Sequence, residues 1–126
     1  MISERLLPKG PAAISKSAGQ SGVILTASQE ETSGYDVYIK ALGTGIDPTT
    51  DADKITLRLR VNGQPFYPLE EQTSQIGELT RPQEFDPPIY LGRGCKVDVF
   101  GEVAATATVT SKLGASFHLL LKVPGT

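Results

Sequence analysis

The chain has one cysteine and one histidine, which could in principle form a nucleophile and its imidazole base. His118 lies in SFHLLLKV, on the side of that run opposite its large apolar residues, and a single histidine there is more typical of a surface than of a general base. Cys95 has Arg93 and Lys96 nearby, but no helix start that would lower the pKa of its thiol. We therefore expect Cys95 to be a small apolar filler and neither residue to be catalytic.

Metal binding would have to rely on carboxylates, because one cysteine and one histidine cannot complete a zinc site. The segment GIDPTTDADK holds Asp47, Asp51 and Asp53, whose hard oxygens could collect Ca²⁺. Their spacing differs from that of an EF-hand loop, and Asp-Pro and Asp-Ala pairs are ordinary in turns. We expect a solvated loop, with an ion site as the open alternative.

Two pairs of acids, Glu70 with Glu71 and Glu84 with Asp86, could suggest glycoside hydrolysis. Such sites usually have aromatic walls, and the chain has four Phe, four Tyr and no Trp. The GRG at 92–94 precedes a strand, whereas a phosphate-binding loop opens a helix. The sequence therefore predicts a protein that is not an enzyme, with no catalytic residue, no cofactor and no metal.

The composition narrows the range of partners. The 126 residues suit one domain, and a net charge of -2 with a pI near 5.3 lacks the basic face of a nucleic-acid-binding protein. No apolar run approaches the ~20 residues that span a bilayer, and charges and prolines interrupt the N-terminal segment where a signal peptide would be apolar. A lone cysteine forms no internal disulfide. We expect a soluble protein made in a cytoplasm, with no nucleic acid and no membrane as partner.

Period-two patterns indicate that β-strands position these residues. In KITLRLRV, apolar and polar residues alternate, and Asn62-Gly63 follows at once, a pair that favours a tight type I′ hairpin turn. The next run, QPFYPLEE, contains two prolines and is predicted to be an edge or irregular strand. Similar alternation occurs in GVILTA, YDVYIKAL, PPIYL, CKVDVFGEV, ATATVTSKL and SFHLLLKV.

About eight short strands separated by Gly, Pro and Asn predict an all-β fold, an antiparallel jelly-roll or Greek-key β-sandwich. We place this domain at residues 21–126. The segment from Gln72 to Pro88 is predicted to be a long crossover loop that could carry binding.

Residues 1–20 are rich in Pro, Gly, Ser and Ala and are predicted to be an extended N-terminal arm. The arm is either a flexible tail or a segment that orders on a neighbouring subunit through Leu6, Leu7 and Ile14. In the last strands, Phe100 and Leu120 occupy positions that the alternation assigns to solvent, which indicates a second core face or a subunit contact. The candidate interface residues are Leu6, Leu7, Ile14, Phe100 and Leu120.

The order of these features resembles that of small jelly-roll proteins of tailed bacteriophage virions. The resemblance rests on ITLRLRVNGQPFYP, then FDPPIYLGRGCKVDVFGEV, then the threonine-rich run ATATVTSKL. It covers residues 21–123. In those proteins, a strand with a "VNGxP" turn precedes a "PPxxLxxG" corner that leads into the next core strand, so the resemblance is a pattern of turns and alternations. In character the chain is most similar to capsid cement or decoration proteins, a family with no catalytic residues to carry over.

The resemblance implies a structural virion protein, made in the host cytoplasm, that binds the outer surface of the capsid. Its partners would be the major capsid protein, at capsomer junctions, and further copies of itself in a homotrimer. Two other hypotheses stay open. A receptor- or carbohydrate-binding module of a fibre or spike would use Tyr35, Tyr38, Tyr67 or Tyr90. A cupin-like enzyme would need more histidine ligands than the chain has.

Overall fold

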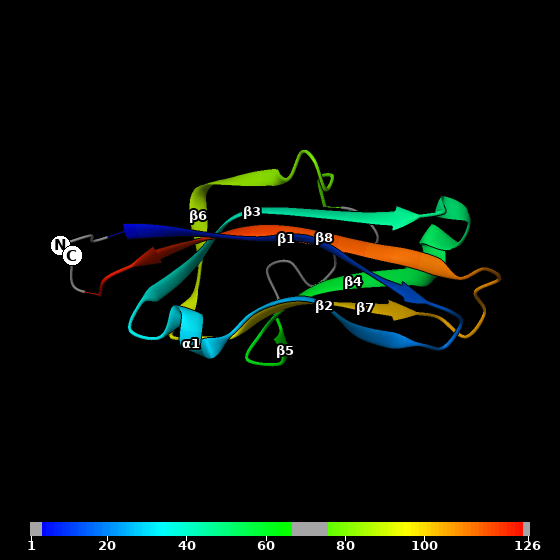
Figure 1. Cartoon of the computed structure of the whole chain (residues 1–126), viewed down its shortest axis with the longest axis horizontal. Coiled ribbons are helices and arrows are strands. Elements are labelled where there is room, and N and C mark those ends of the chain that lie inside the picture. The colour runs from blue at the N-terminus through cyan, green and yellow to red at the C-terminus, as the bar shows by residue number, and fades with distance from the viewer. Residues whose placement is uncertain (1–3, 67–75, 125–126) are drawn as a thin grey trace.

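Two four-stranded antiparallel sheets pack face to face in the computed structural model of the chain, which describes residues 4–66 and 76–124 (Figure 1). The first sheet contains, in spatial order, β1 (Glu4–Lys16), β8 (Ser111–Lys122), β3 (Asp36–Asp47) and β6 (Gln83–Arg93). The second contains β2 (Ser21–Ala27), β7 (Val97–Val103), β4 (Ile55–Val61) and β5 (Gln64–Pro65). The predicted all-β sandwich is confirmed.

The strands pair in a nested order. Strand β1 pairs with β8, β2 with β7, β3 with β6 and β4 with β5. Additional β3–β8 and β4–β7 pairings join these strand pairs into two sheets. At the innermost turn, Asn62 and Gly63 have φ of 52° and 80°, which confirms the predicted positive-φ hairpin turn. The chain is thus one long hairpin wound so that successive strand pairs lie in alternate sheets.

The core lies between the two sheets and takes every second residue of the central strands. Strand β8 lies between β1 and β3, and its inward-facing side chains are fully buried: Leu113, Ala115, Phe117, Leu119 and Leu121. The second sheet contributes Ile55, Leu57 and Leu59 of β4 and Val97 and Val99 of β7. The period-two pattern of these runs therefore does predict which residues face the core.

Two short helical turns connect strands. Helix α1 (Gln29–Thr32) starts with a capping box, in which Ser28 and Glu31 bond each other's backbone N–H groups. The 3₁₀ segment η1 (Thr49–Lys54) joins β3 to β4. Both are too short to leave a helical period in the sequence.

The predicted extended arm at residues 1–20 is wrong over its described part. Residues 4–16 form β1, an edge strand that pairs with β8 from Glu4↔Lys122 to Lys16↔Ser111. Leu7 reaches the core and Ile14 packs against it. Composition misled the prediction because β8 supplies the hydrogen-bond partners and apolar surface that the segment lacks alone. The sandwich therefore begins well before residue 21.

The predicted loop over residues 72–88 is also too long at its C-terminal end, because β6 begins at Gln83; residues 72–75 lie outside the described part. Strand β6 is an edge strand that pairs only with β3. Between Glu84 and Ile89, four residues of β6 lie opposite a single residue of β3, Lys40. Pro87 and Pro88 lie in this bulge. It coincides with the sharp bend of β6 in Figure 1.

The threonine-rich run, predicted to be a strand, is a connection between β7 and β8. Residues 104–110 form turns, and Ala107 donates its N–H to Ala104. The N–H groups of Thr108 and Val109 bond the carboxylate of Asp51 and are unavailable to a strand ladder. In the described part of the predicted edge strand over residues 64–71, β5 covers Gln64–Pro65 and Phe66 is not in a strand; residues 67–71 lie outside the described part.

A second bulge, in the β3–β8 pairing at Lys40, changes which way β3 faces. Strict alternation would place Ala41 on the core side with Val37 and Ile39. Ala41 pairs instead with His118, an exposed residue of β8, and Leu42 takes the core position opposite Phe117. A single inserted residue shifts the alternation of everything that follows it.

Candidate functional site

His118 and Cys95 do not meet in the structure. His118 is exposed on the outer face of β8, opposite Pro8 of β1. Cys95 is buried in the core, and its carbonyl oxygen accepts a 2.6 Å hydrogen bond from the Thr32 hydroxyl. Burial raises the pKa of the Cys95 thiol, so Cys95 packs as a small apolar residue.

Asp51, a candidate ion ligand, is satisfied by the protein itself. Its carboxylate accepts the backbone N–H groups of Thr108 and Val109 at 2.7 and 2.8 Å and the Thr108 hydroxyl at 3.0 Å. Lys54 lies 3.6 Å away. The Val109 N–H is the largest of the causes that hold the pKa of Asp51 below its usual value. The carboxylate therefore fastens η1 to the 104–110 turn.

The other candidate acids are spread over the surface. Asp47 and Asp53 are exposed, as are Glu84 and Asp86 on β6. Glu70 and Glu71 lie outside the described residues. Within residues 4–66 and 76–124, no three His, Cys, Asp or Glu side chains gather closely enough to hold a metal ion.

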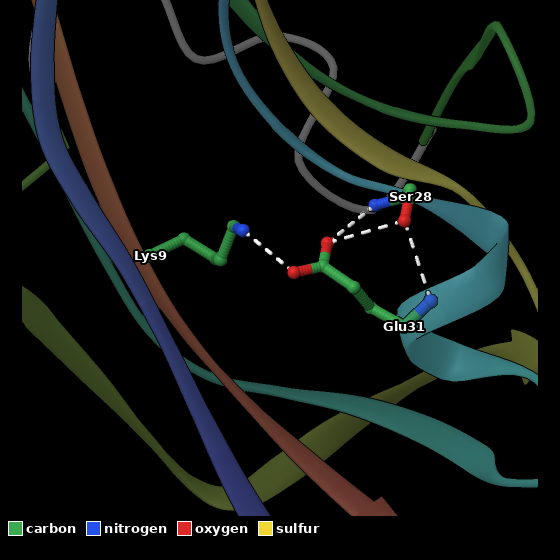
Figure 2. Close-up of polar contacts among 3 residues, drawn as sticks. All are labelled: Lys9, Ser28 and Glu31. Carbon is green, nitrogen blue, oxygen red and sulfur yellow. Dashed lines mark hydrogen bonds and ion pairs between the residues drawn. The ribbon is translucent and has the colours of Figure 1, made fainter.

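A second acid fastens α1 to the first strand. Lys9 of β1 donates a 2.8 Å hydrogen bond to Glu31, whose other oxygen accepts the Ser28 N–H at 2.8 Å (Figure 2). The ammonium of Lys9, and next the Ser28 N–H, hold the pKa of Glu31 below its usual value. This contact ties the edge of the first sheet to the helix that follows β2.

A third acid stabilises the outer face of the second sheet. Asp98 of β7 is fully buried and accepts two hydrogen bonds from Arg60 of β4. The Arg60 guanidinium lies 4.2 Å from the ring centroid of Phe100, a cation–π contact. Phe100 pairs with Val23, one of three large apolar residues exposed in the described part of the chain.

The other two exposed large apolar residues, Leu6 and Tyr90, lie in one row on the outer face of the first sheet, at its two edges. The register aligns Leu6 of β1, Leu120 of β8, Tyr38 of β3 and Tyr90 of β6. We call these four residues the apolar row. Leu6 is 55% and Tyr90 51% exposed, and the rings of Tyr38 and Tyr90 lie 5.2 Å apart. The row crosses all four strands, and exposed apolar surface of this kind marks an interaction site.

A row of charges lies beside the apolar row. The register aligns Glu4, Lys122, Asp36 and Arg93 in strand order, and we call them the charged row. Lys122 lies 3.7 Å from Glu4 and 5.1 Å from the Tyr38 ring centroid. Arg93 donates to Asp36 at 3.2 Å, and the Tyr90 hydroxyl bonds the same carboxylate at 3.3 Å.

The face around the apolar row is hollowed. A depression of about 470 Å³ is lined by Leu6 and Leu120, with Arg5 of β1 and Asp86 of β6 also on its wall. A smaller one of about 240 Å³ lies beside it, where Leu6, Pro8, Lys40, Ala41, Glu84 and His118 meet. Charged walls and an apolar floor are typical of a binding surface.

The other half of the same face is covered by the chain itself. Leu79 lies against the glycines at 45 and 114, and Thr44 and Ile76 exchange two hydrogen bonds, at 2.8 and 3.0 Å. These contacts hold the connection before β6 against β3, which β6 no longer pairs with there. A hollow of about 300 Å³ remains beside Leu79.

The five predicted interface residues separate into three groups. Leu6 and Leu120 come together in the apolar row, Leu7 and Ile14 serve the core, and Phe100 lies on the opposite sheet. Two other members of the row, Tyr38 and Tyr90, are among the tyrosines that the receptor- or carbohydrate-binding hypothesis names. The alternation of β3 places Tyr38 outward, but only the β3–β6 register brings Tyr90 beside it.

Comparison with known proteins gives no relative for this chain. No family model matches it, and no curated protein or solved structure is significantly similar. In the described residues, no helix is long and apolar enough to cross a membrane.

Proposed function

We propose that the chain is a jelly-roll structural protein of a virion. In this proposal it is a capsid cement or decoration protein that binds the outer surface of the major capsid shell at capsomer junctions and stabilises the head. The shell would be stabilised by the sum of many contacts, each of which buries a modest area. Contacts of roughly 800 Å² per partner, repeated over many copies, resist outward pressure even when each is modest.

The strand order of the two sheets is the main support for this proposal. The eight strands lie in the orders β1-β8-β3-β6 and β2-β7-β4-β5. Rolling up one long hairpin of strand pairs produces these orders, and this is the arrangement expected of a jelly roll. A jelly roll is the fold that the resemblance to cement proteins implies. The order depends on long-range pairing, which the runs that carry the resemblance do not encode, so it is additional support.

The use of the acidic side chains also supports a structural role. Asp51, Asp98 and Glu31 each bond an element distant in sequence, and each thereby cross-links the sandwich. Apolar side chains are exposed on both outer faces, Leu6 and Tyr90 on the first sheet and Val23 on the second. Two separate contact faces suit a protein that must hold more than one neighbour.

Binding to shells tests the proposal. Purified protein is added to capsid shells that lack it, taken from the virus that encodes the chain, and bound protein is measured by co-sedimentation and imaging. We expect saturable binding, density at capsomer junctions and a higher temperature of shell disassembly. Shells already saturated with the protein are the control. Absence of binding to unsaturated shells contradicts the proposal.

One observation favours a second candidate, a receptor- or carbohydrate-binding module. Half-buried Tyr38 and exposed Tyr90 form an aromatic pair, tilted by 56°, with the Asp36 carboxylate beside Tyr90. Aromatic faces next to a carboxylate suit a sugar ring. A glycan array with wild type and Tyr90→Ala separates the candidates. A sugar-binding module gives signals that the variant loses, whereas a cement protein gives none.

A further inference from the structure

The charged row has a sign pattern that complements itself. Read from β1 to β6 it is negative, positive, negative, positive: Glu4, Lys122, Asp36 and Arg93. The two end residues therefore differ in sign, and so do the two middle residues. This property matters because a two-fold axis that runs along the strands, between β8 and β3, superimposes the row on its own reverse.

Such an axis would lay the first sheet face to face on a second copy, with β8 over β3 of the partner. Lys122 then faces Asp36 of the second copy, and Glu4 faces Arg93. All four contacts pair opposite charges, and the two central ones stay closest in register when packed sheets cross at about 30°. Opposite charges that face each other fix register and reject wrong partners.

The same rotation matches the apolar row. Leu120 would face Tyr38 of the second copy, and Leu6 would face Tyr90, so the two most exposed members would cover each other. The larger hollow on this face also has charged residues on its wall, Arg5 of β1 and Asp86 of β6. Apolar contact with a charged rim is the usual composition of a protein interface.

We propose that the outer face of the first sheet is a two-fold self-association surface, and that its occupant is a second copy of this chain. The inference does not rest on the proposed function. The register aligns a third row next to the apolar row, Pro8, His118, Ala41 and Glu84. Three rows across four strands give a footprint of about 400 Å² per copy, which is smaller than a stable interface and in the range of weak, transient ones. The dimer is therefore weak, and the fraction of chains in it rises with the protein concentration.

Sedimentation equilibrium on the full chain, from about 5 to 500 µM, measures the dimer dissociation constant at the concentrations where weak interfaces form. Two variants reverse one central charge each, Lys122→Glu and Asp36→Lys. In either homodimer, two like-charge contacts replace two attractive ones. The matched control, Glu102→Lys, changes a charge on the second sheet. Circular dichroism confirms that each variant is folded.

We expect wild type and control to dimerise equally and each reversal to raise the dissociation constant at least about tenfold. An equimolar mixture of the two variants should regain wild-type affinity. In the mixed dimer, the acid introduced at position 122 of one copy faces the lysine introduced at position 36 of the other, while the unmodified Asp36 and Lys122 still pair.

A monomer at all concentrations, a trimer, or reversals without effect would overturn the inference. So would a mixture that stays as weak as its components. Shell binding is unaffected by any of these outcomes, so failure here is distinct from failure of the proposed function.

Discussion

Arg60 donates two hydrogen bonds to the buried Asp98 carboxylate, from Nε at 2.8 Å and from Nη2 at 3.3 Å. The two residues lie on neighbouring strands of the second sheet. Asp98 is inaccessible to solvent, whereas 22% of the Arg60 side chain remains exposed. The carboxylate therefore depends wholly on its partner, and the guanidinium does not. This asymmetry determines how each substitution should behave.

We expect Asp98→Ala to lower the free energy of unfolding by about 2–3 kcal/mol, below the full cost of an orphaned buried charge because Arg60 can rehydrate. The double variant Arg60→Met with Asp98→Leu should lie within about 1 kcal/mol of wild type. Urea unfolding followed by circular dichroism measures both. A double variant as unstable as Asp98→Ala would contradict this account.

Asp51 should give the protein an acid-sensitive contribution to stability. Its pKa in the folded state lies below the unfolded value of 3.8. The stabilisation is therefore complete above about pH 4 and is lost as the pH falls through the lower, folded pKa. We expect the thermal midpoints of wild type and Asp51→Ala to differ at pH 7 and to converge towards about pH 2. Asp53→Ala, at an exposed site, is the control, and parallel curves for Asp51→Ala would disprove the role.

Removal of residues 1–16 tests whether β1 belongs to the sandwich. The deletion takes Leu7 out of the core and exposes the edge of β8, the central provider of buried side chains. We expect loss of cooperative unfolding, seen by differential scanning calorimetry, and aggregation through the exposed edge. A truncated chain that unfolds like the full one would restore the view that this segment is an arm.

Gly43 should be required for the connection that crosses the first sheet. A Cβ there would overlap the Glu78 carbonyl oxygen, while one on Gly45 would only touch Leu79 at 3.4 Å. Gly43→Ala is expected to cost about 1–3 kcal/mol of unfolding free energy, as overpacking does, and Gly45→Ala less than about 1 kcal/mol. Chemical denaturation compares the two. Equal effects would show that the glycine at 43 is not needed for this close approach.

The sequence by itself determined the strand class and much of the core. Alternation in KITLRLRV and SFHLLLKV predicted two strands with an apolar side, and the structure buries Leu57, Leu59, Phe117 and Leu119 on that side; Asn62-Gly63 predicted the turn. These signals are local. A strand exposes its two faces with a period of two, and a turn needs residues that accept positive φ.

Only the tertiary structure decided which strands are neighbours and which residues share a face. Residues 4–16 are a strand because β8 lies beside them, and residues 104–110 are not, because Asp51 holds their N–H groups. The apolar row joins Leu6 to Tyr90 across the full width of a sheet, through pairings between positions far apart in the chain. Long-range hydrogen bonding sets that register, and no local pattern encodes it.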